Sequence, residues 1–497
     1  MTNFDFKGLF IFEMANNHQG DVTHGIKIIK EMGRIARKHG VKAAVKLQYR
    51  HLDTFIHPDF RNDIQAKHIS RFLSTELSPD QFFELVNAIK EEGMFTMCTP
   101  FDEESVDLIL KHKIDIVKIA SCSADDWPLL TKIVKTSKPI IASTGGLNLL
   151  EIDNLYSFLT HRDSNFAILH CVGIYPSPNS TLNLNFISKL KSRYIDITIG
   201  YSGHEKPNNF DVVKVAIAKG AEIFERHVGV PTDTITLNGY SMNPEETDQW
   251  IEAAQVAVEI LGGDKVITKG ESESLLSLKR GVFSRRPIKK GEVIQLEDVF
   301  FAMPCKEGQL TSSDFGKLRA HYTATSDYQA NESIFETVSN DKYHNLRSII
   351  HEAKGMLSEA GIVLNENSEI ELSHHYGIDK FFETGILIVS LVNREYCKKI
   401  IVVFPGQHHP EQYHIKKEET FHILSGQVGL TLNGIESVAK KGDILTIERG
   451  VKHAFWSENG AIIEEISTTH YKSDSFYTDP LITEQDPMTR KTVIERF

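Results

Sequence analysis

The first 265 residues alternate eight times between a short apolar run and a segment with helical periodicity. The runs are LFIFEMA, AAVKLQY, FTMCTPF, IDIVKIAS, PIIASTG, FAILHCVGIY, ITIGYSGH and EIFERHVG. Strands that are covered on both faces are almost continuously apolar, as these runs are. Eight such units in about 260 residues predict a closed (β/α)8 barrel, or TIM barrel. A doubly wound open sheet is the competing fold, but no GxGxxG turn follows the first strand.

The segments between the runs carry helix signals. In HGIKIIKEMGRIARKHG, apolar residues recur at helical spacing and a glycine ends the pattern. In SPDQFFELVNAIKEEG, Ser78 is a candidate N-cap. PEETDQWIEAAQVAVEILGG begins with proline and acidic residues and ends on glycine. We therefore predict an α/β barrel domain over residues 1–265.

Two β-rich segments follow the barrel. Residues 264–276 are predicted to be a polar connector, and residues 276–338 contain short alternating strands interrupted by Lys290-Gly291. Residues 340–475 form the next predicted domain, in which evenly spaced strands with turn glycines begin at Glu371 and indicate a small antiparallel barrel or jelly roll. Residues 476–497 are expected to be a loose polar tail.

Charge and cysteine content exclude several classes of partner. The 497 residues include 55 Lys and Arg against 67 Asp and Glu, a formal net charge of -12. Nucleic acid and membrane surfaces are therefore not expected partners, and any bound anion needs a local basic cluster. The five cysteines include no CxxC pair, and no apolar stretch approaches the ~20 residues of a membrane span. We predict a cytoplasmic protein with free, buried thiols.

Polar residues stand at the carboxyl end of nearly every predicted strand. They are Glu13, Lys46 with Gln48, Thr99, Lys118 with Ser121, Ser143 with Thr144, His170, Ser202 with His204, and His227. A single one of them, such as a histidine bonded to a backbone carbonyl, is better explained by structure. The complete ring is better explained by function, because active sites of such barrels lie at this end and packing alone disfavours buried charges.

The residue types in this ring indicate a chemistry. Lys46 and Lys118, together with the serine and threonine hydroxyls, suit a small phosphorylated carboxylate. His204 and His227 end neighbouring strands and, with Glu13 expected across the rim, can hold one divalent ion. Glu13 is also the candidate general base.

Eight motifs resemble those of the sialic acid synthase family, whose members condense phosphoenolpyruvate with an aldose. They are FEMANNHQG, VKLQ, TPFD, VKIAS, STGG, LHCVGIYP, IGYSGHE and FERHVG, and they cover residues 8 to about 260. The segment SLKRGVFSRRPIKKGEVI resembles the antifreeze-protein-like SAF domain of the same family. The resemblance implies a metal-dependent transferase of carbohydrate biosynthesis that forms a 2-keto-3-deoxy acid and phosphate.

The resemblance also implies roles for particular residues. His204 and His227 would hold Mn or Mg, and Glu13, Lys46 and Lys118 would be catalytic. In the family, the SAF domain of one subunit covers the barrel of its partner in a homodimer and offers an arginine to the sugar. Arg280 matches that arginine, with Arg285 and Arg286 as alternatives. The full set predicted to bind substrate is Gln48, Thr99, Ser121, Ser143, His170, Ser202, Asn238 and Arg280.

Two positions depart from the family pattern on the sugar side. Ser123 stands where a glutamate is usual, and the Asp-containing GPDH-like segment is replaced by TLNGYS, with Asn238 as its nearest counterpart. A changed polar partner in a pocket alters which hydroxyl pattern is accepted. The resemblance implies N-acetylmannosamine or a related sugar as the aldose, and the two departures argue against N-acetylmannosamine itself.

The last domain carries the spacing of two cupin motifs. Gly406, Gln412, His414, Glu419 and Gly426 match the first, and Gly442, Glu448, Gly450, His453 and Ser457 match the second. Gln412 stands where a histidine is usual. The predicted ligands of a possible second metal (Mn, Fe or Zn) are Gln412, His414, Glu419 and His453, with His408 or His409 as substitutes. An empty, merely packed cupin is the alternative.

The cupin leaves two roles open. It is either a sugar isomerase or epimerase that supplies the aldose, or a non-catalytic module that binds a sugar or nucleotide sugar or stabilises an oligomer. For the whole chain, the alternatives to the synthase are a metal-dependent pyruvate aldolase, which releases no phosphate, and a non-catalytic sugar-binding protein.

Overall fold

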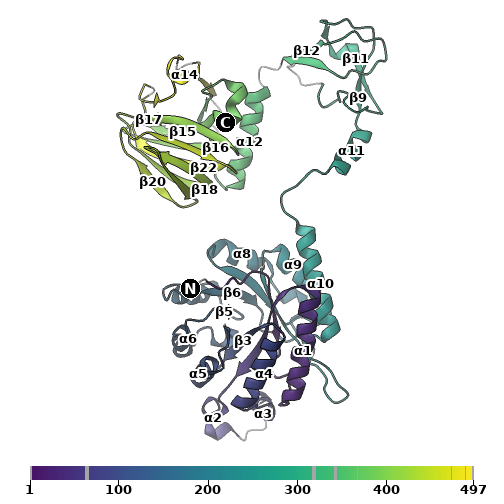
Figure 1. Cartoon of the computed structure of the whole chain (residues 1–497), viewed down its shortest axis with the longest axis vertical. Coiled ribbons are helices and arrows are strands. Elements are labelled where there is room, and N and C mark those ends of the chain that lie inside the picture. The colour runs from purple at the N-terminus through teal and green to yellow at the C-terminus, as the bar shows by residue number, and fades with distance from the viewer. Residues whose placement is uncertain are drawn as a thin grey trace. The chain divides into compact units, whose positions relative to one another are not determined.

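The fold is described from a computed structural model of residues 3–61, 67–315, 321–340, 344–365, 368–471, 473–486 and 489–494. The chain divides into two compact units, Met1–Lys265 and Val266–Phe497 (Figure 1). Each unit is described by itself.

Eight parallel strands of the first unit close into a barrel in the order of the sequence. This confirms the predicted TIM barrel. The strands are β1 (Leu9–Glu13), β2 (Lys42–Tyr49), β3 (Phe95–Pro100), β4 (Ile116–Ile119), β5 (Ile140–Ser143), β6 (Phe166–Cys171), β7 (Thr198–Gly203) and β8 (Ile223–His227).

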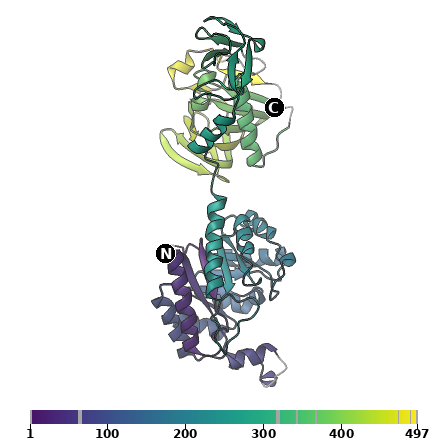
Figure 2. The ribbon, with the colours of Figure 1, turned by 90° about the vertical axis from the view of Figure 1, so that its right-hand side faces the viewer.

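Helices surround the barrel, and two views show them packed against its outer face (Figures 1 and 2). Ser78 caps α4 through a capping box with Gln81, as the sequence predicts. The helices are α1 (Val22–His39), α2 (Leu52–Phe55), α3 (Lys67–Ser74), α4 (Pro79–Glu91), α5 (Glu103–Lys111), α6 (Trp127–Val134), α7 (Leu149–Thr160), α8 (Asn185–Arg193), α9 (Asp211–Ala218) and α10 (Pro244–Leu261).

The barrel interior is apolar near the amino ends of the strands. Leu9, Met97, Ile116, Ile141 and Ile223 belong to one buried cluster there. A larger cluster fills the layer between the strands and the helices. Because the amino end of the barrel is packed, polar side chains that point inward are restricted to the carboxyl end.

The second unit begins with a helix and a small β module. Helix α11 (Lys269–Leu278) lies within and just beyond the segment predicted to be a polar connector, and none of its residues is buried. Thr268 caps the helix through a hydrogen bond from the N–H of Glu271. Strands β9 (Gly281–Ser284) and β11 (Val299–Ala302) pair with each other, and β10 (Val293–Ile294), β12 (His321–Ala324) and β13 (Thr337–Asn340) form a second sheet. The resemblance of this module to a SAF domain stays a prediction.

The remainder of the unit is a curled antiparallel sheet that has the predicted cupin architecture. Helices α12 (His344–Glu359) and α13 (Phe381–Thr384) accompany it. Its strands are β14 (Glu369–Ser373), β15 (Ile386–Asn393), β16 (Tyr396–Val403), β17 (Gln407–Tyr413), β18 (Glu419–Leu432), β19 (Ile435–Lys440), β20 (Ile444–Ile447), β21 (His453–Ser457) and β22 (Ala461–Thr468).

The expected loose tail is instead attached to the cupin sheet. Strand β23 (Phe476–Tyr477) pairs with β17, and β24 (Lys491–Ile494) pairs with β14. The short helix α14 (Pro480–Thr483) lies between them and buries Ile482. The tail is polar in composition, but its backbone completes the exposed edges of two strands.

Two further observations concern the helices and the cysteines. None of the helices in the described ranges combines the length and the apolar character that crossing a membrane requires. The five cysteines are free thiols, and all except Cys122 are buried.

Candidate active site

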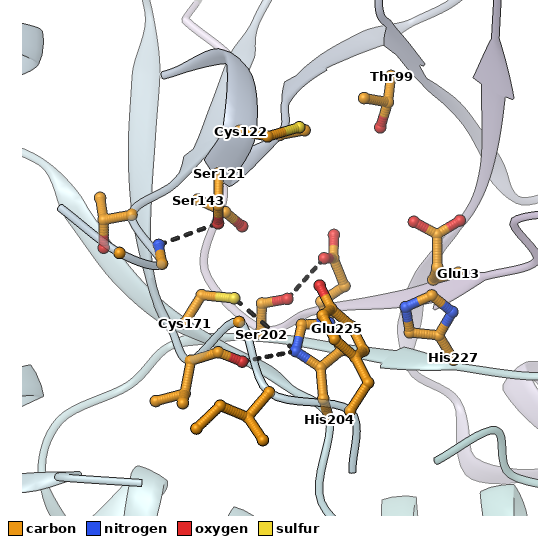
Figure 3. Close-up of a pocket in the computed structure, with 18 of the residues that line it drawn as sticks. Glu13, Thr99, Ser121, Cys122, Ser143, Cys171, Ser202, His204, Glu225 and His227 are labelled. Carbon is orange, nitrogen blue, oxygen red and sulfur yellow. Dashed lines mark hydrogen bonds between the residues drawn. The ribbon is translucent and has the colours of Figure 1, made fainter. Parts of the chain in front are cut away.

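A cavity of about 2240 Å³ opens at the carboxyl ends of the barrel strands. It brings together the barrel residues that the sequence singles out. Those that line it are Glu13, Lys46, Gln48, Thr99, Lys118, Ser121, Ser143, Thr144, His170, Ser202, His204, His227 and Asn238. Figure 3 shows how several of them face a common space from different strands.

Strand alternation explains why most of these side chains point inward. Successive side chains of a strand face opposite sides. Ile223 belongs to the interior cluster, so Glu225 and His227 of β8 point into the barrel as well. The same parity carries Glu13 inward on β1 and Lys118 inward on β4.

Lys46 lies between two buried carboxylates. Its Nζ is 2.5 Å from Glu13 Oε2 and 2.9 Å from Glu225 Oε2. Burial alone lowers the pKa of Lys46, but the two carboxylates outweigh it and raise that pKa above its usual value. Lys46 is therefore an ammonium ion that is already paired with two carboxylates.

Glu225 is the functional residue that the sequence reasoning missed. It is buried, and it accepts a hydrogen bond of 2.7 Å from Ser202 Oγ. Burial raises the pKa of Glu225, but Lys118 and Lys46 lower it to about 2. The sequence did contain a signal for this residue. Glu225 lies two positions before His227, so both side chains point to the same face of β8.

Lys118 is the second buried ammonium of the cavity. It donates to Ser143 Oγ at 2.5 Å and to the carbonyl of Ile119 at 3.1 Å, and Glu225 Oε1 lies 3.9 Å away. Burial lowers the pKa of Lys118 to about 8, although Glu225 acts in the opposite direction. Lys118 therefore carries its charge at neutral pH and loses it in mildly alkaline solution.

His204 and His227 face each other at the metal position that the sequence predicts. Their ring centroids are 5.4 Å apart. Val172 O lies 3.0 Å from His204 Nδ1, which directs Nε2 away from the carbonyl. Burial, and after it the neighbouring His227, lowers the pKa of His204 to about 3, and burial followed by Lys46 lowers that of His227 to about 3. Both imidazoles are neutral, as metal ligands must be, so the residues fit a divalent ion.

Glu13 does not lie across the rim from His227. Because the barrel closes through β8 and β1, the two residues are register partners on adjacent strands (Figure 3). In the described part of the barrel, no three acidic, histidine or cysteine side chains meet as tightly as in the cupin cluster below. A metal here would have two imidazole ligands, with its other positions open to water and substrate.

His170 fits the structural alternative. On β6, Ala167 and Leu169 belong to the barrel interior, whereas Ile168 packs in the layer below the helices. His170 shares the parity of Ile168, and its Nε2 is 2.7 Å from the carbonyl of Leu182. Its ring is held by the scaffold at the cavity wall.

The sugar-side predictions have mixed outcomes. Asn238 lines the cavity, but its Oδ1 accepts the N–H groups of Tyr240 and Ser241. Ser123 is buried outside the cavity lining, where its neighbour Cys122 stands instead. The predicted role of Asn238 in substrate binding stays a prediction.

Arg280 is not among the residues that line the barrel cavity. It precedes β9 in the second unit. Of its alternatives, Arg285 donates to the carbonyl of Val299 and Arg286 pairs with Glu292 and Asp298, so both are engaged within the β module. Arg280 remains the better candidate.

The cavity wall also contains an arginine that the sequence reasoning did not consider. Arg50 lies between the rings of Phe72 and Phe101, with its Cζ 4.0 and 3.7 Å from their centroids. Its Nη2 donates to Gln48 Oε1 at 3.0 Å. Arg50 thereby orients Gln48, whose amide reaches Glu13 at 3.4 Å.

The cupin contains a second cluster with metal-binding character. Ligand atoms of His414, Glu419 and His453 all lie within 4.8 Å of one another, and the three side chains are buried. Nδ1 of His414 is 2.5 Å from the carbonyl of Asp474, and Nδ1 of His453 is 3.1 Å from that of Val451. Each Nε2 is thus directed at Glu419, at 3.2 and 3.4 Å. The donor set fits a divalent ion.

The other predicted cupin ligands lie nearby. Gln412 Nε2 is 3.4 Å from His453 Nε2, so the amide borders the cluster. His409 lines a pocket that also contains His414 and Glu419, and its ring stacks on Phe455. His408 stacks on Trp456 and is exposed. Of the two substitutes, the structure favours His409.

Comparisons with known proteins give the family. Residues 33–266 match the NeuB family, and residues 399–463 match the cupin domain. An uncharacterised protein of Methanocaldococcus jannaschii is 32% identical over 297 residues, which are 59% of this chain and 84% of that protein. The chain belongs to the NeuB family.

Two further relatives of this NeuB-family chain are informative. The crystal structure of a putative spore coat polysaccharide biosynthesis protein E from Chromobacterium violaceum is 45% identical, with a TM-score of 0.63, and covers 66% of this chain and 98% of its own. The human N-acetylneuraminate-9-phosphate synthase is 27% identical over 298 residues, 58% of this chain and 80% of that protein. The NeuB-family chain is an enzyme of the predicted class, a phosphoenolpyruvate-dependent transferase that forms a carbon–carbon bond.

Proposed function

We propose that the barrel condenses phosphoenolpyruvate with the open-chain aldehyde of an aldose, giving a 2-keto-3-deoxy acid and phosphate. The observation that supports this most is the meeting of Lys46, Lys118, Glu13 and Glu225 beside two neutral imidazoles in one cavity. In such a site, the ammonium groups and hydroxyls can bind a phosphate and the carboxylates can transfer protons. The imidazoles can coordinate a metal.

Phosphoenolpyruvate is expected to lie over Lys118. The ammonium on β4 and the hydroxyls of Ser121 just after β4, Ser143 on β5 and Ser202 on β7 all line the cavity. The four buried charges of Lys46, Lys118, Glu13 and Glu225 cancel one another. Glu225 helps to keep Lys118 protonated for the anion, and the hydroxyl donors add to anion binding without adding charge.

The reaction consists of two additions and one elimination. C3 of phosphoenolpyruvate attacks the aldehyde carbon, a C–C bond forms, and the aldehyde oxygen becomes an alkoxide. Water adds to C2 and gives one proton to Glu13, which passes it to the alkoxide. The tetrahedral intermediate then releases phosphate by cleavage of the C2–O bond, and the C2 hydroxyl gives its proton to the departing phosphate and becomes the ketone. Orienting two substrates and stabilising developing charge are the main contributions of the protein.

His204 and His227 would hold the divalent ion. When bound, such an ion polarises the aldehyde oxygen. Two imidazole donors favour Mn over Mg, because Mg prefers a set of oxygen ligands.

The aldose is proposed to be N-acetylmannosamine or a related sugar. Tyr175 and Tyr240 accompany the two histidines, with the Tyr175 ring 4.1 Å from that of His204 and the Tyr240 ring 5.0 Å from that of His227. Aromatic faces of this kind suit the apolar face of a sugar. Asn238 offers an amide on the same side.

The experiment incubates the full-length protein with phosphoenolpyruvate, Mn and N-acetylated, 2,4-diamino and unsubstituted aldoses. Phosphate release and product mass are followed together, with Lys118→Met as the inactive control. One phosphate per adduct supports the synthase. A parallel incubation replaces phosphoenolpyruvate with pyruvate. An adduct formed only from pyruvate indicates the aldolase instead, and no adduct from either donor with any aldose contradicts both.

The cupin is proposed to bind a second divalent ion, Mn, Fe or Zn, through His414, Glu419 and His453, with Gln412 beside them. The supporting observation is the convergence of both Nε2 atoms on Glu419. Metal analysis of wild type and of His414→Ala tests this: the variant should lose one ion per chain while synthase activity remains. Loss of an aldose isomerase activity in the same variant would identify the cupin as the supplier of the sugar.

A homodimer is also proposed, in which the β module of one subunit brings Arg280 to the barrel of the other. The support is the resemblance of that module to a SAF domain and the presence of Arg280 next to β9.

A further inference from the structure

The cupin encloses a second pocket, of about 380 Å³. It is bordered by the His414–Glu419–His453 cluster at one side and by a group of buried lysines and glutamates at another. Its volume is in the range of sites for small metabolites. The barrel synthase accounts for neither the pocket nor its charges.

Several buried polar atoms at this pocket make no hydrogen bond within the described ranges. They are Nδ1 of His409, and also Nε2 of His414 and Oε2 of Glu419, whose polar contacts are the distances of 3.2 and 3.4 Å within the cluster. Buried polar groups are nearly always satisfied in folded proteins. Three such atoms around one cavity therefore point to a bound group that completes them.

A lysine holds the carboxylate that the metal would need. Nζ of Lys417 forms ion pairs with Glu419 and, at 3.1 Å, with Glu465. Lys399 also pairs with Glu465, at 3.5 Å. All four side chains are buried, so their two positive and two negative charges cancel as the structure stands.

The other charged groups around the pocket balance separately. Glu371 and Lys491 pair at 2.6 Å. Asp474 accepts backbone N–H groups of residues 415–417, and Arg490 lies over the ring of Tyr477. Glu369 is exposed to solvent. The charges of Glu371 and Lys491 cancel, as do those of the buried Asp474 and Arg490, so the buried groups of this set add no net charge.

A divalent ion at the cluster disturbs this balance. It takes Glu419 as a ligand and leaves Lys417 and Lys399 with a single carboxylate, Glu465. Two buried positive charges are then in excess, and burying unbalanced charge is strongly unfavourable. A neutral sugar does not relieve the excess, whereas an oxyanion does.

We propose that the metal-loaded cupin pocket binds a small metabolite through an oxyanion, a carboxylate or a phosphate, and that Lys417 leaves Glu419 to hold that oxyanion. The inference rests on the second metal site proposed above. Without the metal, Lys417 competes with the ion for Glu419. With the metal bound, Lys417 is the group that recognises the ligand.

The test uses full-length protein that carries His204→Ala and His227→Ala, so that only the cupin binds Mn. Calorimetry measures Mn first, and then pyruvate, inorganic phosphate and erythritol on the Mn-loaded protein. We expect Mn loading to create one further site per chain for pyruvate or phosphate, in addition to any binding in the barrel that does not need Mn, and we expect erythritol not to bind at this further site. The preference between the two anions identifies which oxyanion the site takes.

Lys417→Met is the decisive variant, and the exposed neighbour Lys416→Met is its matched control. Without the competing ammonium, Mn should bind at least about tenfold more tightly, while the anion should bind at least about tenfold more weakly. Lys416→Met should change neither affinity. Glu465→Gln is the second variant, in case Lys417→Met does not fold. It removes the carboxylate that Lys399 and Lys417 share, so it should tighten anion binding.

The outcomes separate the two proposals. Absence of Mn binding contradicts the second metal site itself. Mn binding without metal-dependent anion binding, equal binding of erythritol, or anion binding that Lys417→Met and Glu465→Gln leave unchanged overturns the oxyanion inference and leaves the metal site intact.

Discussion

Lys46 on β2 and Glu225 on β8 form an ion pair of 2.9 Å inside the mouth of the barrel. The pair joins two strands that are not neighbours, since β1 lies between them. Glu225 also accepts the Ser202 hydroxyl and lies near Lys118. It is therefore the group through which both lysines and one hydroxyl of the anion site are coupled.

Glu225→Gln should impair phosphoenolpyruvate binding. The amide removes the charge that holds up the pKa of Lys118, so this pKa falls further and the ammonium is lost at lower pH. Above the present pKa of about 8, we expect kcat/KM for phosphoenolpyruvate to fall about tenfold for each unit by which the pKa of Lys118 falls. Initial rates at varied phosphoenolpyruvate measure it. Glu222→Gln, at the other end of the barrel, is the control, and an unchanged kcat/KM in Glu225→Gln would contradict the assignment.

The pH dependence should report Lys118. Its pKa is lowered to about 8 by burial, so the ammonium that meets the anion is present below that pH and is lost above it. We expect kcat/KM for phosphoenolpyruvate to fall with a single deprotonation on the alkaline side. Glu225→Gln should move this limb to lower pH, and Lys118→Arg should remove it. An alkaline limb that neither variant moves belongs to another group.

His227→Ala should weaken metal binding in the barrel. The measurement needs a background of His414→Ala and His453→Ala, so that the cupin does not contribute. Losing one of two imidazole ligands should weaken Mn binding by at least about a hundredfold. His39→Ala is the control, because this mostly covered histidine pairs with Asp248 and does not line the cavity. Equal Mn affinity in both proteins would exclude His227 as a ligand.

Gly200→Ala should destabilise the barrel. A Cβ at this position would lie 2.6 Å from the carbonyl oxygen of Ile223 on the neighbouring strand, where the backbone cannot yield. Overpacking of this kind costs about 1–3 kcal/mol. Thermal unfolding followed by barrel-specific fluorescence measures it. Gly263→Ala meets nothing within 4 Å and should leave the melting temperature unchanged.

Mixing two inactive variants tests the proposed dimer. Arg280→Ala and His227→Ala place their defects in different parts of the chain. If each active site combines the barrel of one subunit with the Arg280 of the other, a mixture that exchanges subunits should regain about a quarter of wild-type activity. Activity measured before and after exchange gives the answer. No recovery, with exchange shown by mass spectrometry, contradicts the shared site.

Most of the barrel was predictable because its strands are buried on both faces and read as apolar runs. Helix α11 and the terminal strands β23 and β24 were not, because their sequences are polar and their order comes from capping and from pairing with existing edges. Short polar segments of this kind carry little periodicity for sequence reasoning to detect.

The site residues at the strand ends could be predicted from the sequence. Residues whose role depends on which face of the strand they occupy were harder to predict. Applying the alternation rule would have added Glu225 and set aside His170. The motif residues Glu205 and Arg226 illustrate the same limit, because they form a buried pair of 2.5 Å outside the cavity lining. Lys417 carried no sequence signal, since its meaning depends on Glu465, which lies on a different strand.

The most direct test follows the bridging oxygen of phosphoenolpyruvate. The substrate is labelled with 18O between C2 and phosphorus and converted with an accepted aldose. Addition of water at C2 followed by C–O cleavage predicts that the released phosphate carries the label. Unlabelled phosphate would mean that the P–O bond breaks, and it would contradict the proposed reaction.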